Sequence, residues 1–225
     1  MTPVEFYFDV SCPWTWMTSR WITDVAPQRD LDITWRTYSL KIRNEGREIP
    51  PQFAEPMAAQ FRALRVIDAA RAAHGDDVVG PLYTQIGARI HHDGDRMLDG
   101  LADAVGAAGV DLAVMDAADD ETWDAVVRAS TDTAVQLVGE DVGIPIVRLA
   151  GTPTFSGPIV SPAPRGEAAA KLWDAFVALG QFDGVYEIKR SRMSGGQRIK
   201  PQFAPRPSLP RLDEHRGADD ARVVE

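Results

Sequence analysis

The sequence predicts an α/β protein, and two patterns lead to that class. Strand-like segments with alternating or aromatic-rich composition lie near the N-terminus and again after residue 140, while apolar residues between them recur at helical spacing. The length of 225 residues suits one large domain, or one domain with an insertion. We therefore expect a sheet domain over residues 1–45 and 141–190, an all-helical insertion over 46–140, and a tail over 191–225.

The N-terminal segments predict a strand–helix–strand unit. Residues 3–10 alternate and are aromatic-rich, which is typical of a strand. Residues 12–25 follow as a helix, with Pro13 in the first turn, where a missing N–H costs nothing. Residues 31–39 form the second strand. A βαβ unit in this order is expected to be right-handed with parallel strands.

The later segments predict helices, then a hairpin and a closing helix. Helical spacing runs from Phe53 to about residue 138, after a loop over 44–51. Strands are expected at 144–149 and 154–160, joined by a turn at Ala150-Gly151, and a last helix at 165–179 with an apolar stripe that includes Leu179. The tail is polar and Pro-rich, so we expect it to be extended or partly disordered.

The bulk composition excludes several classes of protein. A net charge of −9 argues against general nucleic-acid binding, which needs a basic surface. A single cysteine excludes a disulfide framework and a multi-cysteine zinc site. No secretory leader and no apolar run of membrane-spanning length is found, so we expect a cytoplasmic protein with a free thiol.

Cys12 is the strongest candidate for chemistry. It follows the first strand in the segment Ser11-Cys12-Pro13-Trp14-Thr15 and stands at the mouth of the predicted helix. Unpaired backbone N–H groups and the positive end of the helix dipole favour a thiolate there, so we expect a lowered pKa. A lone cysteine is more often a small buried apolar residue. The turn, the βαβ unit and the later strand favour the reactive reading here.

These segments together carry a resemblance. The chain resembles the DsbA-like thioredoxin superfamily, which includes kappa-class glutathione transferases and 2-hydroxychromene-2-carboxylate isomerases, and within it the actinobacterial mycothiol-dependent reductases of nitroreductase type. The matching segments are Phe-Asp-Val-Ser-Cys-Pro-Trp-Thr-Trp, Ser39-Leu40, Asn44-Glu45-Gly46-Arg47, Leu82-Tyr83-Thr84, Arg89-Ile90-His91-His92 and Phe155-Ser156-Gly157-Pro158. The resemblance implies a thioredoxin-like fold with an all-α domain inserted between the N-terminal βαβ unit and the C-terminal ββα unit.

The resemblance also implies a site. Pro145 would be the superfamily's cis-proline beside Cys12, and Ile144 would present its backbone to an extended thiol ligand. Two-cysteine relatives have a second cysteine where this chain has Thr15. Thr15 cannot resolve a mixed disulfide, although its hydroxyl can donate a hydrogen bond to the Cys12 thiolate. We therefore expect a monothiol oxidoreductase that uses a low-molecular-weight thiol, mycothiol or possibly glutathione, as co-substrate.

Two other functions stay open. Kappa transferases and chromene isomerases have a serine at the position of Cys12, whose hydroxyl holds a cofactor thiolate, so the chain could act as a thiol-dependent transferase or isomerase on an electrophilic substrate. A catalytically inert binding protein could use the same cleft. A covalent adduct on Cys12 separates the first function from the other two.

Several nearby residues have a functional and a structural interpretation. Trp14 flanks the sulfur and can form a wall for the substrate, or simply pack. Asn44 can contact the thiol, or serve the turn with Gly46. Asp9 is expected to cap the helix more readily than to tune Cys12. Trp16 and Trp21 are expected in the core. A tyrosine of relatives falls near Phe53, which puts nitro-group reduction in doubt.

The remaining motifs carry less. His91 and His92 are adjacent, so their side chains diverge on a helix and we expect no metal site. A basic stretch in the tail is expected to pack on the protein's own surface or on a partner subunit, which leaves a homodimer possible. Its members are Lys189, Arg190, Arg192, Arg198 and Lys200.

Overall fold

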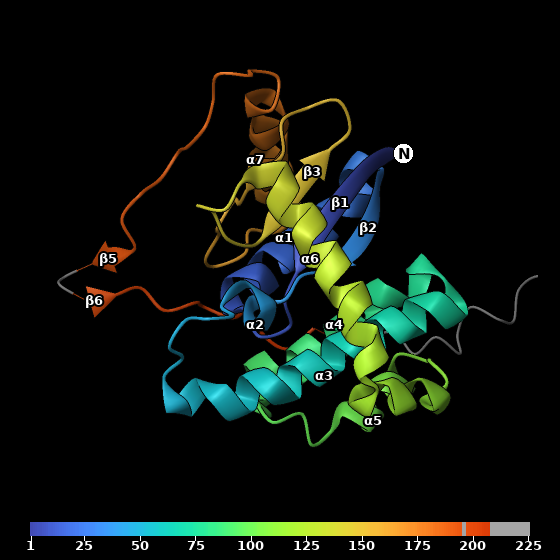
Figure 1. Cartoon of the computed structure of the whole chain (residues 1–225). Coiled ribbons are helices and arrows are strands. Elements are labelled where there is room, and N and C mark those ends of the chain that lie inside the picture. The colour runs from blue at the N-terminus through green and yellow to red at the C-terminus, as the bar shows by residue number, and fades with distance from the viewer. Residues whose placement is uncertain (195–196, 208–225) are drawn as a thin grey trace, which may run out of the picture.

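A mixed four-stranded sheet organises the molecule (Figure 1). The computed structural model describes residues 1–194 and 197–207. The strands are β1 (Thr2–Phe8), β2 (Leu31–Thr37), β3 (Ile146–Leu149) and β4 (Phe155–Ser156), in the order β2-β1-β3-β4. β1 and β2 are parallel, while β3 is antiparallel to β1 and β4 to β3. The predicted βαβ unit and hairpin therefore form one sheet.

The crossover helix α1 (Pro13–Arg29) is held by its aromatic residues. Trp16 and Trp21 are fully buried, as the sequence predicts. Trp21 packs against Trp173 and Phe176 of α7 (Gly166–Leu179), whereas Trp16 meets Tyr83 of the inserted helices edge to face. The helix thus joins the closing helix to the insertion, and its N-terminal end is fixed from both sides.

The segment between β2 and β3 is helical, as expected. It also contains a short helix at its start that the sequence analysis left unassigned; Ser39 caps this helix by accepting a hydrogen bond from the Ile42 N–H. Glycines with positive φ end two of the longer helices, at Gly75 and Gly139. The elements are α2 (Leu40–Arg43), α3 (Pro51–His74), η1 (Asp76–Val78), α4 (Val79–Ala88), η2 (Arg89–Asp93), α5 (Leu101–Ala107), η3 (Leu112–Asp119), η4 (Glu121–Trp123) and α6 (Asp124–Val138).

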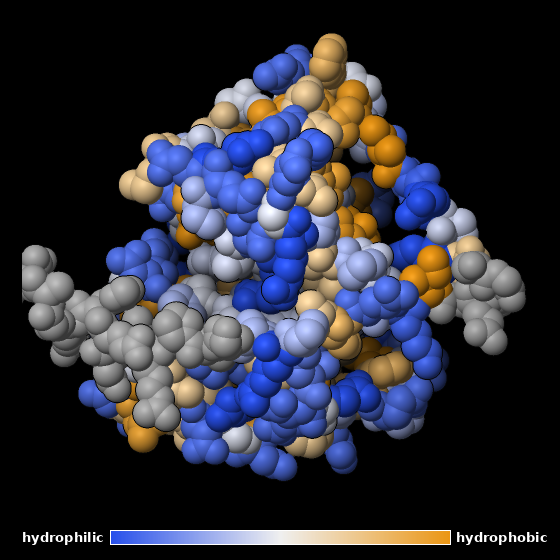
Figure 2. Space-filling model, turned by 180° about the vertical axis from the view of Figure 1, so that it is seen from behind, coloured by the Kyte–Doolittle hydropathy of each residue, from blue (hydrophilic) through white to orange (hydrophobic). Residues whose placement is uncertain are grey.

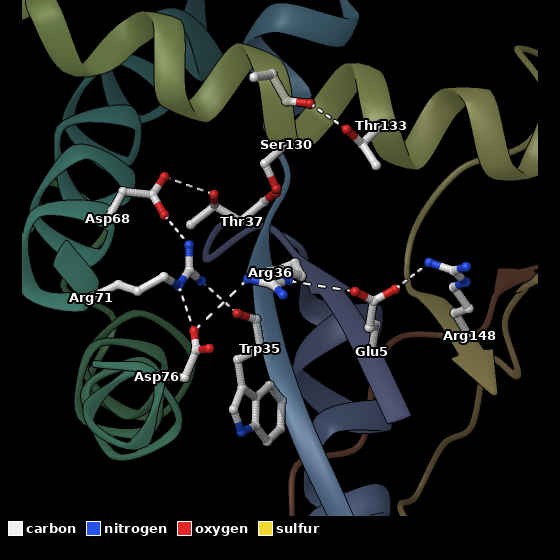
Figure 3. A network of polar contacts seen from close by, with 11 residues as sticks. Glu5, Trp35, Arg36, Thr37, Asp68, Arg71, Asp76, Ser130, Thr133 and Arg148 are labelled. Atoms are coloured by element: carbon white, nitrogen blue, oxygen red, sulfur yellow. Dashed lines mark hydrogen bonds and ion pairs between the residues drawn. The ribbon is translucent and has the colours of Figure 1, made fainter. Parts of the chain in front are cut away.

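A buried polar network fastens the insertion to the sheet (Figure 3). Arg71 of α3 pairs with Asp68 and with Asp76, and also donates to the Trp35 carbonyl of β2. The other oxygen of Asp68 accepts from the Thr37 hydroxyl at 2.8 Å. Asp68 is buried and Arg71 is mostly buried, so their bonds to Thr37 and to the Trp35 carbonyl fix α3 against the end of β2 that leads to the site.

The hairpin and closing helix differ in detail from the prediction. β4 spans only two residues of the expected 154–160, since Gly157 has φ 118° and begins an irregular segment with cis bonds before Pro158 and Pro162. In α7 the buried face is formed by Trp173 and Phe176, while Leu179 is exposed, so its place in the apolar stripe is wrong.

The described part of the tail is mostly extended and contains a small two-stranded sheet. Residues 187–207, the arm, include a small hairpin of β5 (Met193–Ser194) and β6 (Gln197–Arg198). Figure 1 shows the arm leaving α7, swinging away on the left and returning to the body; Figure 2 shows it standing off the mostly hydrophilic surface seen from behind. Phe203 then packs on His91 and His92, and Arg206 pairs with Asp93 at 3.0 Å. The part of the predicted tail beyond residue 207 lies outside the described residues.

Among the helices described, none combines the length and the apolar character that crossing a bilayer requires.

Candidate functional site

Cys12 is the N-cap of α1. The backbone N–H of Cys12 donates to the Asp9 carbonyl at 3.1 Å, and its own carbonyl accepts the first helical hydrogen bond from Trp16 at 3.0 Å. Pro13 occupies the first helical position, where its fixed φ suits the turn. The end of β1 and the start of α1 therefore place the sulfur at the helix mouth, as the sequence predicts.

The sulfur lies in an apolar environment that we call the Cys12 cluster. Its buried members come from four parts of the chain, namely Tyr7, Cys12, Tyr38, Ala134, Ile144 and Ile146. Partly buried side chains close the cluster from outside, namely Trp14, Leu40, Val135, Leu137 and Val138. Only 7% of Cys12 is exposed, so attack on a disulfide requires part of this cover to move.

Burial raises the pKa of Cys12, which corrects the lowered pKa expected from the helix position. The Thr15 hydroxyl and the backbone N–H groups of Trp14 and Thr15 act in the expected direction and favour the thiolate. Removal from water outweighs them, and the charge of Asp9 adds to the rise. In this closed arrangement the sulfur is a neutral thiol.

Thr15 is buried, and among residues 1–194 and 197–207 its hydroxyl has no hydrogen-bond partner. Ionisation of Cys12 supplies an acceptor, because the hydroxyl favours the charged form of that sulfur. The Thr15 hydroxyl therefore lacks an acceptor while Cys12 is a thiol and gains one when Cys12 becomes a thiolate. The energy of this side chain thus depends on the protonation state of the sulfur.

Ile144 packs in the same cluster as Cys12, and Pro145 follows it in the chain. Ile144 belongs to the Cys12 cluster, and the Ile144–Pro145 peptide bond is cis, the form that the resemblance implies. The Pro145 carbonyl accepts from the Gly157 N–H at 2.7 Å, and ladder pairing of β3 begins one residue later, at Ile146. The segment thus passes the sulfur just outside the sheet.

Trp14 and Asn44 occupy different positions relative to Cys12. Trp14 is half-buried and packs on the Cys12 cluster. Asn44 ends α2, and its side-chain amide donates to the Leu40 carbonyl at 2.8 Å, which is the turn role. Leu40 packs on the cluster, so Asn44 is one helical turn from the cover of the site.

Asp9 does not cap α1, because no side chain caps that helix. Its two oxygens accept from the backbone N–H groups of Ser11, at 2.8 Å, and of Leu40, at 2.6 Å. It therefore joins the turn before Cys12 to α2 across the site. Burial raises the pKa of this carboxyl, and the hydrogen bonds from Ser11 and Leu40 oppose the rise.

The two histidines brace α1 from the insertion. His91 donates its Nε2–H to the Val10 carbonyl at 3.0 Å, and burial lowers its pKa to about 4, so the ring is neutral. His92 accepts from the Trp16 indole N–H at 3.3 Å. Within residues 1–194 and 197–207, no group of three or more His, Cys, Asp or Glu side chains could hold a metal ion.

Sequence reasoning missed two neighbours of the site. Tyr38 is fully buried in the Cys12 cluster, although the sequence shows only that it ends a strand. The guanidinium of Arg192, in the arm, lies 5.1 Å from the centre of the Trp14 ring. The basic stretch was visible in the sequence, but nothing placed it beside Cys12.

The chain has the thioredoxin-like fold of DsbA-like proteins. A probable DsbA oxidoreductase from Streptomyces coelicolor has a TM-score of 0.56 at 18% identity, covering 90% of this chain and all of that one. A 2-hydroxychromene-2-carboxylate isomerase has a TM-score of 0.54 at 14% identity, covering 80% and 95%.

The family is more specific. Residues 11–190 match the Rv2466c-like family, described as mycothiol-dependent nitroreductase Rv2466c, and the chain belongs to it. An uncharacterized protein of Mycobacterium tuberculosis (strain ATCC 25618 / H37Rv), Rv2286c, is 32% identical over 201 residues, which are 85% of this chain and 83% of that protein. The resemblance read from the sequence is thereby confirmed at both levels.

Proposed function

We propose that the chain is a cytoplasmic monothiol oxidoreductase that exchanges disulfides through Cys12 with a low-molecular-weight thiol, mycothiol or a similar one. The observation that carries the proposal is a single cysteine at the N-cap of α1, packed in one cluster with Ile144, whose peptide bond to Pro145 is cis. The family description, which is that of a mycothiol-dependent enzyme, supports the small thiol as co-substrate.

The cycle needs two exchanges. The Cys12 thiolate attacks one sulfur of a disulfide RSSR, which forms the Cys12–SR bond, breaks the S–S bond and releases RS⁻. A second thiolate, R′S⁻, then attacks the sulfur of the bound R group, forms RSSR′ and restores the Cys12 thiolate. Thr15 stabilises the thiolate in both its forming and its leaving role, because its hydroxyl favours the charged sulfur.

The other proposed site residues position the ligand. Ile144, with Pro145 in the cis form, offers backbone to an extended thiol as an added strand, and Trp14 forms the outer wall. Pro13 fixes the turn that aims the sulfur. Asn44 contacts a ligand only after its bond to Leu40 is exchanged. Phe53, which is exposed and bears no hydroxyl, gives no support to nitro-group reduction.

The burial of Cys12 favours a second candidate. A neutral thiol in an apolar cluster can donate its S–H to the thiolate of a bound cofactor, which would then carry out a transfer or isomerisation on an electrophile. No bond to Cys12 forms in that mechanism.

Covalency tests the proposal. The protein is incubated with oxidised low-molecular-weight thiols, and intact mass spectrometry is expected to show one adduct on Cys12 that a second thiol removes. Cys12→Ser serves as the control without a thiol. An unmodified protein that still turns over an electrophile, with Cys12→Ser retaining turnover, would replace the first function by the second.

A further inference from the structure

The arm returns a positive charge to the site on an acidic protein. The chain has a net charge of −9, yet its residues 189–200 contain five cations. One of them, Arg192, is half-buried with its guanidinium over the face of Trp14, two residues after the nucleophile. A guanidinium on an aromatic ring keeps its N–H groups free at the edges for a ligand.

No carboxylate of residues 1–194 or 197–207 lies within 4.0 Å of Arg192. Lys189 of the same arm differs, since it faces Glu187 at 3.7 Å. Within the described residues, Arg192 therefore places a guanidinium against Trp14 with no carboxylate paired to it.

Further cations stand on the other side of the Cys12 cluster. Arg43 and Arg47 lie close enough to Tyr38 that their charges favour the ionised form of its hydroxyl, while Arg43 donates a hydrogen bond to the Glu140 carbonyl. Asp9, the carboxylate whose charge acts on the sulfur, is buried and its oxygens accept from backbone N–H groups. Arginines from two segments far apart in the sequence thus lie near members of the Cys12 cluster.

The arm holds this position through its far limb. Phe203 packs on both histidines, the Gln202 N–H donates to the Ser161 hydroxyl at 2.9 Å, and Arg206 pairs with Asp93. Ile199 also donates its N–H to the Arg192 carbonyl at 2.6 Å, which fixes the backbone of that residue.

We propose that Arg192 is a specificity-determining residue that binds a carboxylate on the disulfide with which Cys12 exchanges. The inference rests on the proposed function and adds to it a class of substrate. Arg192 takes no part in the exchange of sulfurs. It favours the approach of an anionic disulfide and orients it along Trp14, so it changes the choice of substrate rather than the chemistry.

Three disulfides that differ in charge test this choice. Rate constants for adduct formation on Cys12 are measured with dithiodiglycolate, which is anionic, hydroxyethyl disulfide, which is neutral, and cystamine, which is cationic. Arg192→Gln is expected to slow the anionic disulfide about fivefold, the factor of a partly exposed ion pair. It should leave the neutral one unchanged and speed the cationic one. Added salt should reduce the anionic preference of the wild type.

Arg190→Gln is the matched control, because it removes the same charge from an exposed position of the same arm. An equal effect of the two substitutions, or an equal loss with all three disulfides, would overturn the inference while leaving the exchange reaction intact. Binding without chemistry gives a second measurement. In a Cys12→Ala background, S-methylglutathione should bind more tightly than its neutral ester unless Arg192 is replaced, and equal binding of both ligands would also refute the role of Arg192.

Discussion

Replacing Thr15 by valine separates the stability of the fold from the reactivity of the sulfur. The two side chains have the same shape, and Thr15 is fully buried with an unsatisfied hydroxyl. An unsatisfied buried polar group costs about 1–3 kcal/mol, so Thr15→Val should raise the free energy of unfolding by about 1 kcal/mol or more. For a domain of this size that corresponds to roughly 2–4 °C in Tm.

The same change should make the thiol less reactive. The Thr15 hydroxyl lowers the pKa of Cys12, and a hydrogen bond to a charged group contributes about 1.5–3 kcal/mol. Because about 1.4 kcal/mol corresponds to a factor of ten, the thiolate population at neutral pH should fall by about tenfold or more. The rate of alkylation by iodoacetamide, measured at a fixed pH below the pKa, should fall by the same factor.

Thr18→Val on the next turn of α1 is the matched control. Thr18 is equally buried, but its hydroxyl donates to the Pro158 carbonyl at 2.8 Å. Its loss should lower the free energy of unfolding by about 1 kcal/mol and leave alkylation within twofold. Urea unfolding gives the first quantity. If Thr15→Val were destabilising, or if alkylation were unchanged, the account of the hydroxyl as a partner of the thiolate alone would be refuted.

Three further predictions follow from burial and pKa. The raised pKa of Cys12 contributes stability that is present below the unfolded-state pKa of the thiol, about 8.5, and is lost as pH rises, by up to about 1.4 kcal/mol per pH unit. Cys12→Ala should therefore lose less stability than the wild type between about pH 8.5 and 10. Parallel curves of unfolding free energy against pH for the two proteins would refute this. His91 has a pKa of about 4, so it contributes stability that is present above about pH 6.5 and is lost as pH falls, by up to about 3 kcal/mol. In His91→Gln the amide can still donate a hydrogen bond, so the stability of this variant should depend less on acid than that of the wild type. An unchanged acid dependence would contradict the neutral, buried state of His91. A Cβ on Gly87 would approach the Trp16 ring to 2.3 Å, so Gly87→Ala should lower the free energy of unfolding in urea by about 1–3 kcal/mol. Gly106 lies in open space on another helix, so Gly106→Ala should raise the same quantity by up to about 1 kcal/mol. An equal gain for both variants would show that the Trp16 side chain can move aside.

Local patterns accounted for the elements near the site. Alternation in residues 3–10, proline after Cys12 and the aromatic spacing of Trp16 and Trp21 depend on neighbours along the chain, so the strand, the helix and its buried face could be predicted. The short helix α2 escaped notice, because four residues give too little periodicity to recognise.

The electrostatics could not be read in the same way. A helix N-terminus lowers the pKa of a thiol wherever it occurs, but burial depends on what covers the sulfur, and that cover includes Ala134 and Ile144, more than 120 residues away. Asp9 likewise follows the strand as a capping residue would, yet its oxygens are used by Ser11 and by Leu40, whose position only the packing of α2 fixes. Sequence spacing carries no information on such desolvation.

By itself the sequence determined that this protein has one thiol, that the thiol stands where a strand runs into a helix, and that Thr15 leaves it without a resolving partner in the chain. Those properties are local, so residue types and short-range spacing suffice. Only the tertiary structure decided that Cys12 is covered and neutral in this arrangement, that Ile144, before the cis Pro145, packs in its cluster, and that Arg192 reaches Trp14. Burial and long-range approach arise when distant segments pack together, and that packing sets both the charge of the sulfur and the charge of its surroundings.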